Sequence, residues 1–149
     1  MILNIIIGFI IPWLTGIILY FKDKRLLLIT VPFQSSMSFA INVIGYNKDY
    51  WNLYPFKLEH MAAMPFDIGL YPILGVWMLY LIKISKLNTY FIILFFTIST
   101  TFLEFLGVLT GRVFYAHGWN IFYTFLSYLL PYVLSYLYYL ALKNNDVFN

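Results

Sequence analysis

Cysteine is absent from the chain of 149 residues. Its absence excludes disulfides, thiolate catalysis, iron–sulfur clusters and cysteine-based zinc sites. Charge is also scarce, because Asp, Glu, Lys and Arg make up only 10% of the residues, against about 25% in a typical soluble domain. Hydrophobic residues reach 62%, more than a soluble fold of this length could bury. We therefore expect an integral membrane protein whose first partner is the lipid bilayer.

Catalytic and phosphate-binding signatures are missing as well. The sequence has no G-x-S-x-G elbow, no glycine-rich phosphate loop and no histidine pair at H-E-x-x-H spacing. The net charge of +3 comes from short basic clusters at the ends of apolar runs, whereas nucleic-acid binding needs a basic face. We expect no cofactor, no metal site and no nucleic-acid partner.

The apolar runs are long enough to cross a bilayer, which takes about 20 residues each. We predict an all-α integral membrane bundle of five transmembrane helices that forms a single domain over residues 1–149. The helices are expected at about 1–21, 26–46, 66–84, 90–111 and 119–142. Residues 47–64 mix charges, proline and aromatic rings, which is typical of the membrane surface. There we expect an interfacial outer loop, with a short helix as one option.

Basic residues set the expected orientation. Counting Lys and Arg on alternate sides of the predicted helices gives six against three. The larger set consists of Lys22, Lys24, Arg25, Lys83, Lys86 and Lys143, and the smaller set of Lys48, Lys57 and Arg112. The positive-inside rule then places the N-terminus outside and the C-terminus in the cytoplasm. The prediction is a multi-pass protein of the cell membrane.

Small, polar and kinking residues recur at helical spacing within the runs, which places them along one face of each helix. These stripes are Asn4, Gly8, Pro12 and Gly16; Gln34, Ser38 and Asn42; Thr97, Thr100, Thr101, Glu104, Gly107 and Gly111; and Tyr123, Ser127, Pro131 and Ser135. Two interpretations stay open. Such stripes allow close helix packing with hydrogen bonds between helices, or they line a polar cavity for a ligand.

Ionisable groups in the outer half are a stronger signal, because a charge at membrane depth costs at least ~2.5 kcal/mol. Glu104 lies 14 residues beyond Tyr90, which is about 21 Å from the inner end of a core about 30 Å thick. Arg112, on roughly the same helical face, is its simplest expected partner. Asp67 opens the third predicted helix, where it is expected to cap the helix N-terminus or to join the same cluster.

We therefore predict an outward-facing polar pocket. The candidate ligand-binding residues are Asn42, His60, Asp67, Glu104, Arg112 and His117. If the protein is an enzyme, Glu104 or Asp67 is the expected acid/base group.

Several short motifs carry a resemblance. They are Tyr50-Trp51, Pro65-Phe66-Asp67 leading into Tyr71-Pro72, Phe102-Leu103-Glu104, and Tyr115 with Gly118-Trp119-Asn120. These motifs resemble a family of small polytopic membrane proteins from endospore-forming Gram-positive bacteria. The resemblance implies a bacterial protein of five membrane helices and implies no particular activity.

Two functions are consistent with the sequence, and a third possibility is a purely structural helix-packing role that needs no pocket. The first is a binding, assembly or small transport subunit that uses the outer pocket, either as a homo-oligomer or beside other membrane subunits. The alternative is a membrane-embedded enzyme that acts on a lipid or isoprenoid. The absence of a catalytic motif favours the first.

Overall fold

The computed structural model describes residues 1–148, and helices dominate it. Four helical segments of the described chain are long and apolar enough to cross a membrane. They are Ile2–Asn47, Phe56–Ile84, Thr89–Leu109 and Ile121–Asn144. The expected number of five separate helices is not matched, because the first two predicted ranges lie within one segment of 46 residues.

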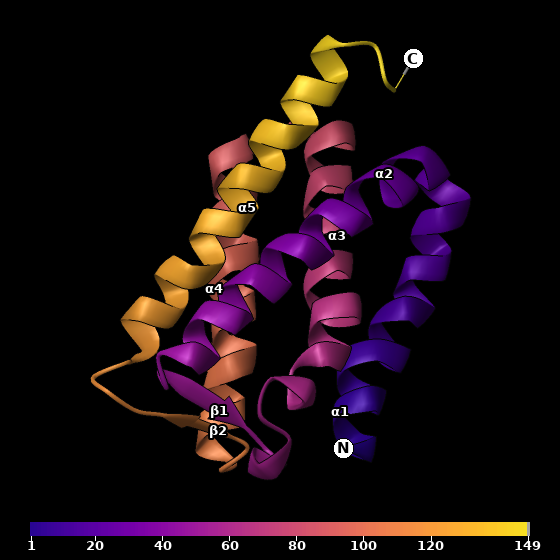
Figure 1. The fold of residues 1–149 in the computed structure, drawn as a ribbon. Coiled ribbons are helices and arrows are strands. Elements are labelled where there is room, and N and C mark those ends of the chain that lie inside the picture. Colours follow the sequence, from indigo (N-terminus) through magenta and orange to yellow (C-terminus); the bar gives the residue numbers. More distant parts are fainter. Residues whose placement is uncertain (149) are drawn as a thin grey trace.

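The first segment consists of α1 (Ile2–Ile5), the π-helical turn η1 (Ile6–Ile10) and α2 (Ile11–Asn47). Its helical geometry breaks at Asp23, where φ is −155° and ψ is 76°. The Asp23 carboxylate accepts a hydrogen bond from the Leu26 N–H at 3.0 Å, as an N-cap does. Figure 1 shows the chain turning back here. We call residues 2–22 the first arm and residues 24–47 the second arm.

The other helices start and end near the predicted positions. They are the short 3-10 helix η2 (Phe56–Ala62), the π-helical turn η3 (Phe66–Leu70), α3 (Tyr71–Ile84), α4 (Thr89–Leu109) and α5 (Ile121–Asn144). Asn88 caps α4 through the Tyr90 N–H at 2.8 Å, and Asn120 caps α5 through the Phe122 N–H at 3.0 Å. These caps satisfy backbone donors that have no partner within the helix.

A two-stranded sheet closes one end of the bundle. β1 (Trp51–Leu53) pairs antiparallel with β2 (Val113–Tyr115), with Trp51 opposite Tyr115 and Leu53 opposite Val113. The sheet lies at the end of the molecule where the N-terminus and the end of α4 lie (Figure 1). Residues 47–64 therefore contain a short 3-10 helix, which the sequence analysis gave as one option, and a strand that was not predicted.

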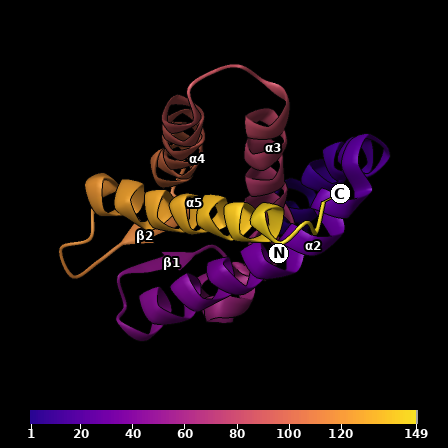
Figure 2. The ribbon, with the colours of Figure 1, turned by 90° about the horizontal axis from the view of Figure 1, so that it is seen from above.

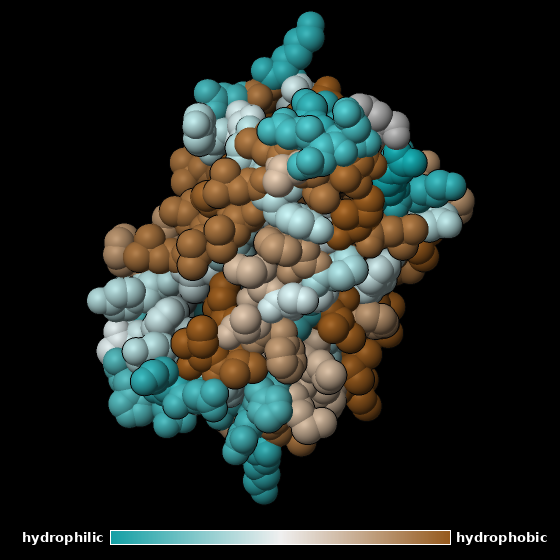
Figure 3. Space-filling model, turned by 45° about the horizontal axis from the view of Figure 1, so that its top comes forward, coloured by the Kyte–Doolittle hydropathy of each residue, from teal (hydrophilic) through white to brown (hydrophobic). Residues whose placement is uncertain are grey.

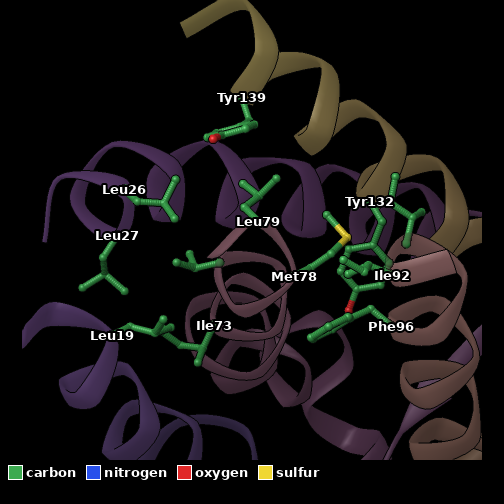
Figure 4. Close-up of a cluster of buried hydrophobic side chains, with 12 residues drawn as sticks. Leu19, Leu26, Leu27, Ile73, Met78, Leu79, Ile92, Phe96, Tyr132 and Tyr139 are labelled. Atoms are coloured by element: carbon green, nitrogen blue, oxygen red, sulfur yellow. The ribbon is translucent and has the colours of Figure 1, made fainter. Parts of the chain in front are cut away.

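The core lies where the helices meet. Seen from above, α3 lies between α4 and the first arm, and α5 lies beside the second arm (Figure 2). Buried side chains from all of these elements pack together (Figure 4); among them are Leu19, Leu26, Ile73, Met78, Leu79, Ile92, Phe96, Tyr132 and Tyr139. At the end opposite the sheet, the Lys83 ammonium pairs with the Asp23 carboxylate at 2.5 Å.

Hydrophilic side chains gather at the two ends of the molecule, and a mostly apolar band separates them (Figure 3). Many large apolar residues of the helices are exposed within this band; examples are Ile17, Phe91, Phe95, Ile98 and Leu130. An apolar band between two polar ends is the surface that a bilayer requires, and it is consistent with a multi-pass membrane protein.

The first arm packs at very short range against the segment Phe56–Ile84, where the turns η1 and η3 meet. A Cβ on Gly69 would lie 2.2 Å from the carbonyl oxygen of Gly8 and 2.7 Å from the Cα of Phe9. Gly8 belongs to the first predicted stripe, and Asn4, Pro12 and Gly16 of that stripe are buried with it. For this stripe the structure supports the packing interpretation.

Gly69→Ala is therefore expected to destabilise the protein by about 1–3 kcal/mol, because the added methyl group meets backbone atoms that cannot rotate away. Gly107→Ala is the matched control, since its Cβ would meet the Cγ2 methyl group of Val113 at 2.8 Å, a side chain that can move. Unfolding of the two purified variants in detergent measures the difference. Equal stability of the two variants would contradict a backbone contact at Gly69.

Candidate functional site

Glu104 is held by hydroxyl groups rather than by a cation. Its Oε1 accepts a hydrogen bond from the Tyr115 hydroxyl at 2.5 Å and lies 3.4 Å from Thr124 Oγ1. Its Oε2 accepts a hydrogen bond from the Tyr128 hydroxyl. No basic side chain among residues 1–148 lies within ion-pair distance of this carboxylate. Three donors therefore orient the carboxylate, and none of them neutralises it.

The expected pair of Glu104 and Arg112 is wrong. Arg112 is exposed, and its guanidinium lies over the ring of Tyr54, 5.7 Å from the centroid. The physical reason is that α4 ends at Leu109 and that Gly111 has a φ of +67°, which turns the chain away from the helix axis. Because the helix ends between them, the spacing of eight residues does not place Glu104 and Arg112 on one helical face.

The Tyr115 hydroxyl is a dependable donor to Glu104. Tyr115 lies in β2, outside the long helices, and burial together with the nearby Glu104 carboxylate raises the pKa of its hydroxyl above the usual value. The hydroxyl therefore stays protonated at physiological pH and keeps donating its hydrogen bond.

Asp67 is buried in the turn η3, just before α3, where it is 1% exposed. Its Oδ1 accepts hydrogen bonds from Ser38 Oγ at 2.5 Å and from Asn42 Nδ2 at 2.6 Å. The expected capping role is wrong, since Pro65 holds the cap position and no side chain caps this turn. Asn42 in turn accepts a hydrogen bond from the Trp51 indole at 3.1 Å. Asp67 thus ties its own segment to the second arm and, through Asn42, to β1.

A polar cavity of about 50 Å³ lies between the second arm and α5. Its polar lining comes from α2, α4 and α5 and consists of Gln34, Ser38, Asn42, Glu104, Ser127 and Ser135. Aromatic rings complete the wall; they belong to Trp51, Tyr71, Trp119, Tyr128 and Tyr132. No Lys, Arg or His side chain lines the cavity. The second predicted stripe therefore lines a polar cavity, as the second interpretation expected.

Gln34 is the polar group of this cavity that lacks a partner. Its side chain is 6% exposed, and within the described chain its Nε2 has no hydrogen-bond partner. The amide fits only because α3 has a glycine beside it, since a Cβ on Gly75 would lie 1.4 Å from Gln34 Oε1. A buried donor without an acceptor costs about 1–3 kcal/mol. Only a molecule that carries a hydrogen-bond acceptor, such as water, would remove that cost, since a bare cation offers the N–H no acceptor.

A second cavity lies on the other side of Glu104, and we call it the groove. It has a volume of about 620 Å³ and lies between the first arm and α4, with α3 behind it. Leu53, Tyr71, Glu104 and Tyr128 line both the polar cavity and the groove. The hydroxyls of Tyr71 and Tyr128 are hydrogen-bonded at 3.0 Å. Together with the Glu104 carboxylate they form a thin partition between a polar and an apolar space.

The two histidines predicted for the pocket do not reach it. His60 lies in η2 and is exposed, and His117 is exposed with its Nδ1 3.0 Å from the carbonyl oxygen of Asp49. Of the six candidates, Asn42 and Glu104 line the polar cavity, Asp67 is bonded to its wall, and Arg112 lines the groove. Among residues 1–148 no group of three or more His, Asp and Glu side chains could hold a metal ion.

Residues that bind Glu104 were missing from the predicted site. Thr124 and Tyr128 lie four residues apart on the inner face of α5, and this spacing was a usable signal. Tyr115 gave no such signal, because its position depends on pairing between β1 and β2.

Asp67→Ala is expected to destabilise the protein more than Asp67→Asn does. Alanine leaves the donors of Ser38 and Asn42 without an acceptor, at about 1–3 kcal/mol for each unpaired group, whereas asparagine keeps one acceptor oxygen. Asp49→Asn is the control, because Asp49 is exposed and its φ of 53° suits asparagine. Unfolding in detergent ranks the three variants. Wild-type stability of Asp67→Ala would show that these hydrogen bonds do not hold the segments together.

Comparison of the chain with protein-family models, with curated proteins and with solved structures finds no match. The geometry of Glu104, Asp67 and the cavities between the helices is therefore the basis for a functional proposal.

Proposed function

We propose that this chain is a membrane protein that crosses the bilayer five times and binds a small monovalent cation in the polar cavity between α2 and α5. The observation that carries the proposal is the environment of Glu104, a carboxylate at the wall of a cavity that has no basic side chain. In this function the protein is a binding or small transport subunit of the cell membrane, either as a homo-oligomer or beside other membrane subunits.

The number of crossings follows from the length of the two arms. Each arm of the first segment has the roughly 20 residues that a crossing takes, and the chain reverses between them (Figure 1). Three further crossings by α3, α4 and α5 place the chain termini on opposite sides. The larger basic set gathers at the end that holds Asp23 and the C-terminus, so the positive-inside rule favours a cytoplasmic position for that end. The sheet and the polar cavity then lie in the outer half.

The charge of the cavity favours a cation. A carboxyl group at membrane depth is costly as an unpaired ion, because the dielectric is low, so Glu104 either holds a proton or binds a positive charge. Tyr115 and Tyr128 donate hydrogen bonds to Glu104 without supplying that charge. A bound cation supplies it.

The lining favours a monovalent cation over a divalent one. Ca²⁺ and Mg²⁺ are usually bound by several oxygens that include more than one carboxylate, whereas Glu104 is the one carboxylate among the lining residues. Aromatic faces attract cations such as ammonium groups, and Trp51 and Trp119 provide them here. Hydroxyl oxygens of Ser127 and Ser135 add neutral ligands. A cavity of about 50 Å³ suits an alkali ion, ammonium or a small amine.

A membrane-embedded enzyme acting on a lipid or isoprenoid is the second candidate. It is favoured by one observation, which is that Glu104 lines the apolar groove as well as the polar cavity. A carboxyl group in that position could exchange a proton with an apolar substrate that enters from the bilayer.

Addition of the preferred cation is expected to raise the unfolding temperature of the purified protein, because a ligand at 100 times its Kd stabilises the folded state by about 2.7 kcal/mol. The measurement compares Li⁺, Na⁺, K⁺, ammonium and methylammonium with N-methylglucamine at equal ionic strength. Glu104→Gln is expected to keep the fold and lose the shift, because the amide keeps an acceptor oxygen and loses the charge.

Asp49→Asn is the control for charge at the outer surface and is expected to keep the full shift. No shift in the wild type with any of the cations would refute the proposal, and so would a full shift in Glu104→Gln. An enzyme would instead lose turnover in Glu104→Gln while cations left its unfolding temperature unchanged.

Single-cysteine variants test the crossings, since the natural chain offers no thiol of its own. A membrane-impermeant maleimide applied outside intact cells is expected to label Lys48→Cys and Lys57→Cys. Lys24→Cys and Lys86→Cys are expected to stay unlabelled until the membrane is permeabilised. Outside labelling of Lys24→Cys would show that the first arm does not cross the bilayer.

A further inference from the structure

The groove has the length of one leaflet. The residues that line it extend from Leu3 to Thr15 on the first arm and from Thr100 to Thr110 on α4. At 1.5 Å per residue these walls are about 18 Å and about 15 Å long. Half of a hydrocarbon core about 30 Å thick is about 15 Å. A groove of this length accommodates the part of a lipid chain that lies in one leaflet.

The groove opens toward the bilayer. Its mouth is formed by apolar side chains that protrude from the two walls, with Ile7 and Ile11 on the first arm and Leu103 and Leu106 on α4 exposed by 41–51%. Ile73 and Leu74 of α3 form its back. Water is a poor occupant of an apolar space, which offers it no hydrogen-bond partners. An acyl chain, by contrast, finds van der Waals contacts on three sides.

A positively charged side chain lies at the end of the groove nearest the sheet. Arg112 lines it, and the Tyr54 N–H donates a hydrogen bond to the Arg112 carbonyl oxygen at 2.8 Å. The guanidinium lies over the Tyr54 ring, and no acidic side chain of the described residues is within ion-pair distance. The nearby Asn4 amide is already bonded to the carbonyl oxygens of Tyr54 and Ala62, at 2.8 and 2.9 Å. Arg112 is thus held in place with its charge available.

We propose that the groove binds a phospholipid, with one acyl chain between the first arm and α4 and the phosphate on Arg112. Guanidinium groups bind phosphate through two parallel hydrogen bonds, which fixes the headgroup at the end of the groove. The groove shares a wall with the polar cavity, but the contacts proposed for the lipid, with Arg112 and the apolar walls, need no cation in that cavity. The orientation proposed above decides only that the lipid comes from the outer leaflet.

The test uses the full-length protein in phosphatidylcholine vesicles that contain a trace of phosphatidylglycerol with a photoactivatable acyl chain. Crosslinks are mapped by peptide and are expected at groove residues of the first arm and α4, in excess over the exposed face of α4 around Phe91. Leu103→Trp fills the groove and is expected to reduce groove crosslinks about tenfold. Phe102→Trp, on the neighbouring exposed position of the same helix, is expected to leave them unchanged.

A second comparison tests the phosphate. Diacylglycerol with the same photoactivatable chain lacks phosphate and is expected to crosslink to the wild type about tenfold less than the phospholipid, the effect of losing one charge-assisted hydrogen bond. Arg112→Gln is expected to remove that preference. Equal labelling of the groove and of the face around Phe91 would overturn the proposal, as would an unchanged preference in Arg112→Gln. A groove covered by a second copy of the chain would give no lipid crosslinks at its lining residues, which would also overturn the proposal.

Discussion

Asp67 accepts hydrogen bonds from Ser38 at 2.5 Å and from Asn42 at 2.6 Å, and these contacts hold the second arm against η3. In a bilayer no water replaces such partners, so the three side chains must stay together. Asn42 extends the connection to Trp51 and hence to the sheet. The sheet in turn brings Tyr115 to Glu104. The arrangement of the sheet end of the bundle thus depends on one buried acid that has a structural role.

Glu104 belongs to two environments at once. On one side it faces a polar cavity with serine, amide and aromatic groups, and on the other it lines an apolar groove. A lipid chain in the groove would exclude water from that side of the carboxylate. Electrostatic attraction strengthens as the local dielectric falls, so an occupied groove would increase the affinity of the polar cavity for a cation. The two proposed sites are therefore coupled through the wall that they share.

Much of this arrangement could be predicted from the sequence. The helix ranges, and the polar residues Asn42, Asp67 and Glu104 as members of one outer region, followed from apolar runs and helical spacing. Three features could not be predicted. The Asp23 carboxylate caps the second arm at the turn, a contact that apolar runs do not indicate. Pairing of β1 with β2 joins residues that are distant in sequence. Arg112 lies beyond the positive φ of Gly111, where helical spacing no longer indicates neighbours.

The two buried carboxylates differ in what their partners permit. Asp67 binds the Ser38 hydroxyl and the Asn42 amide, and the amide is also held by the Trp51 indole. Ser38 and Asn42 line the polar cavity, whereas Asp67 does not. Glu104 binds hydroxyls of Tyr115 and Tyr128, and a hydroxyl hydrogen can rotate between acceptors. When a cation approaches Glu104, those hydrogens can turn away from the carboxylate while their oxygens stay in place. Glu104 is therefore the acid suited to exchange hydrogen bonds for a bound cation, and Asp67 is suited to hold the helices together.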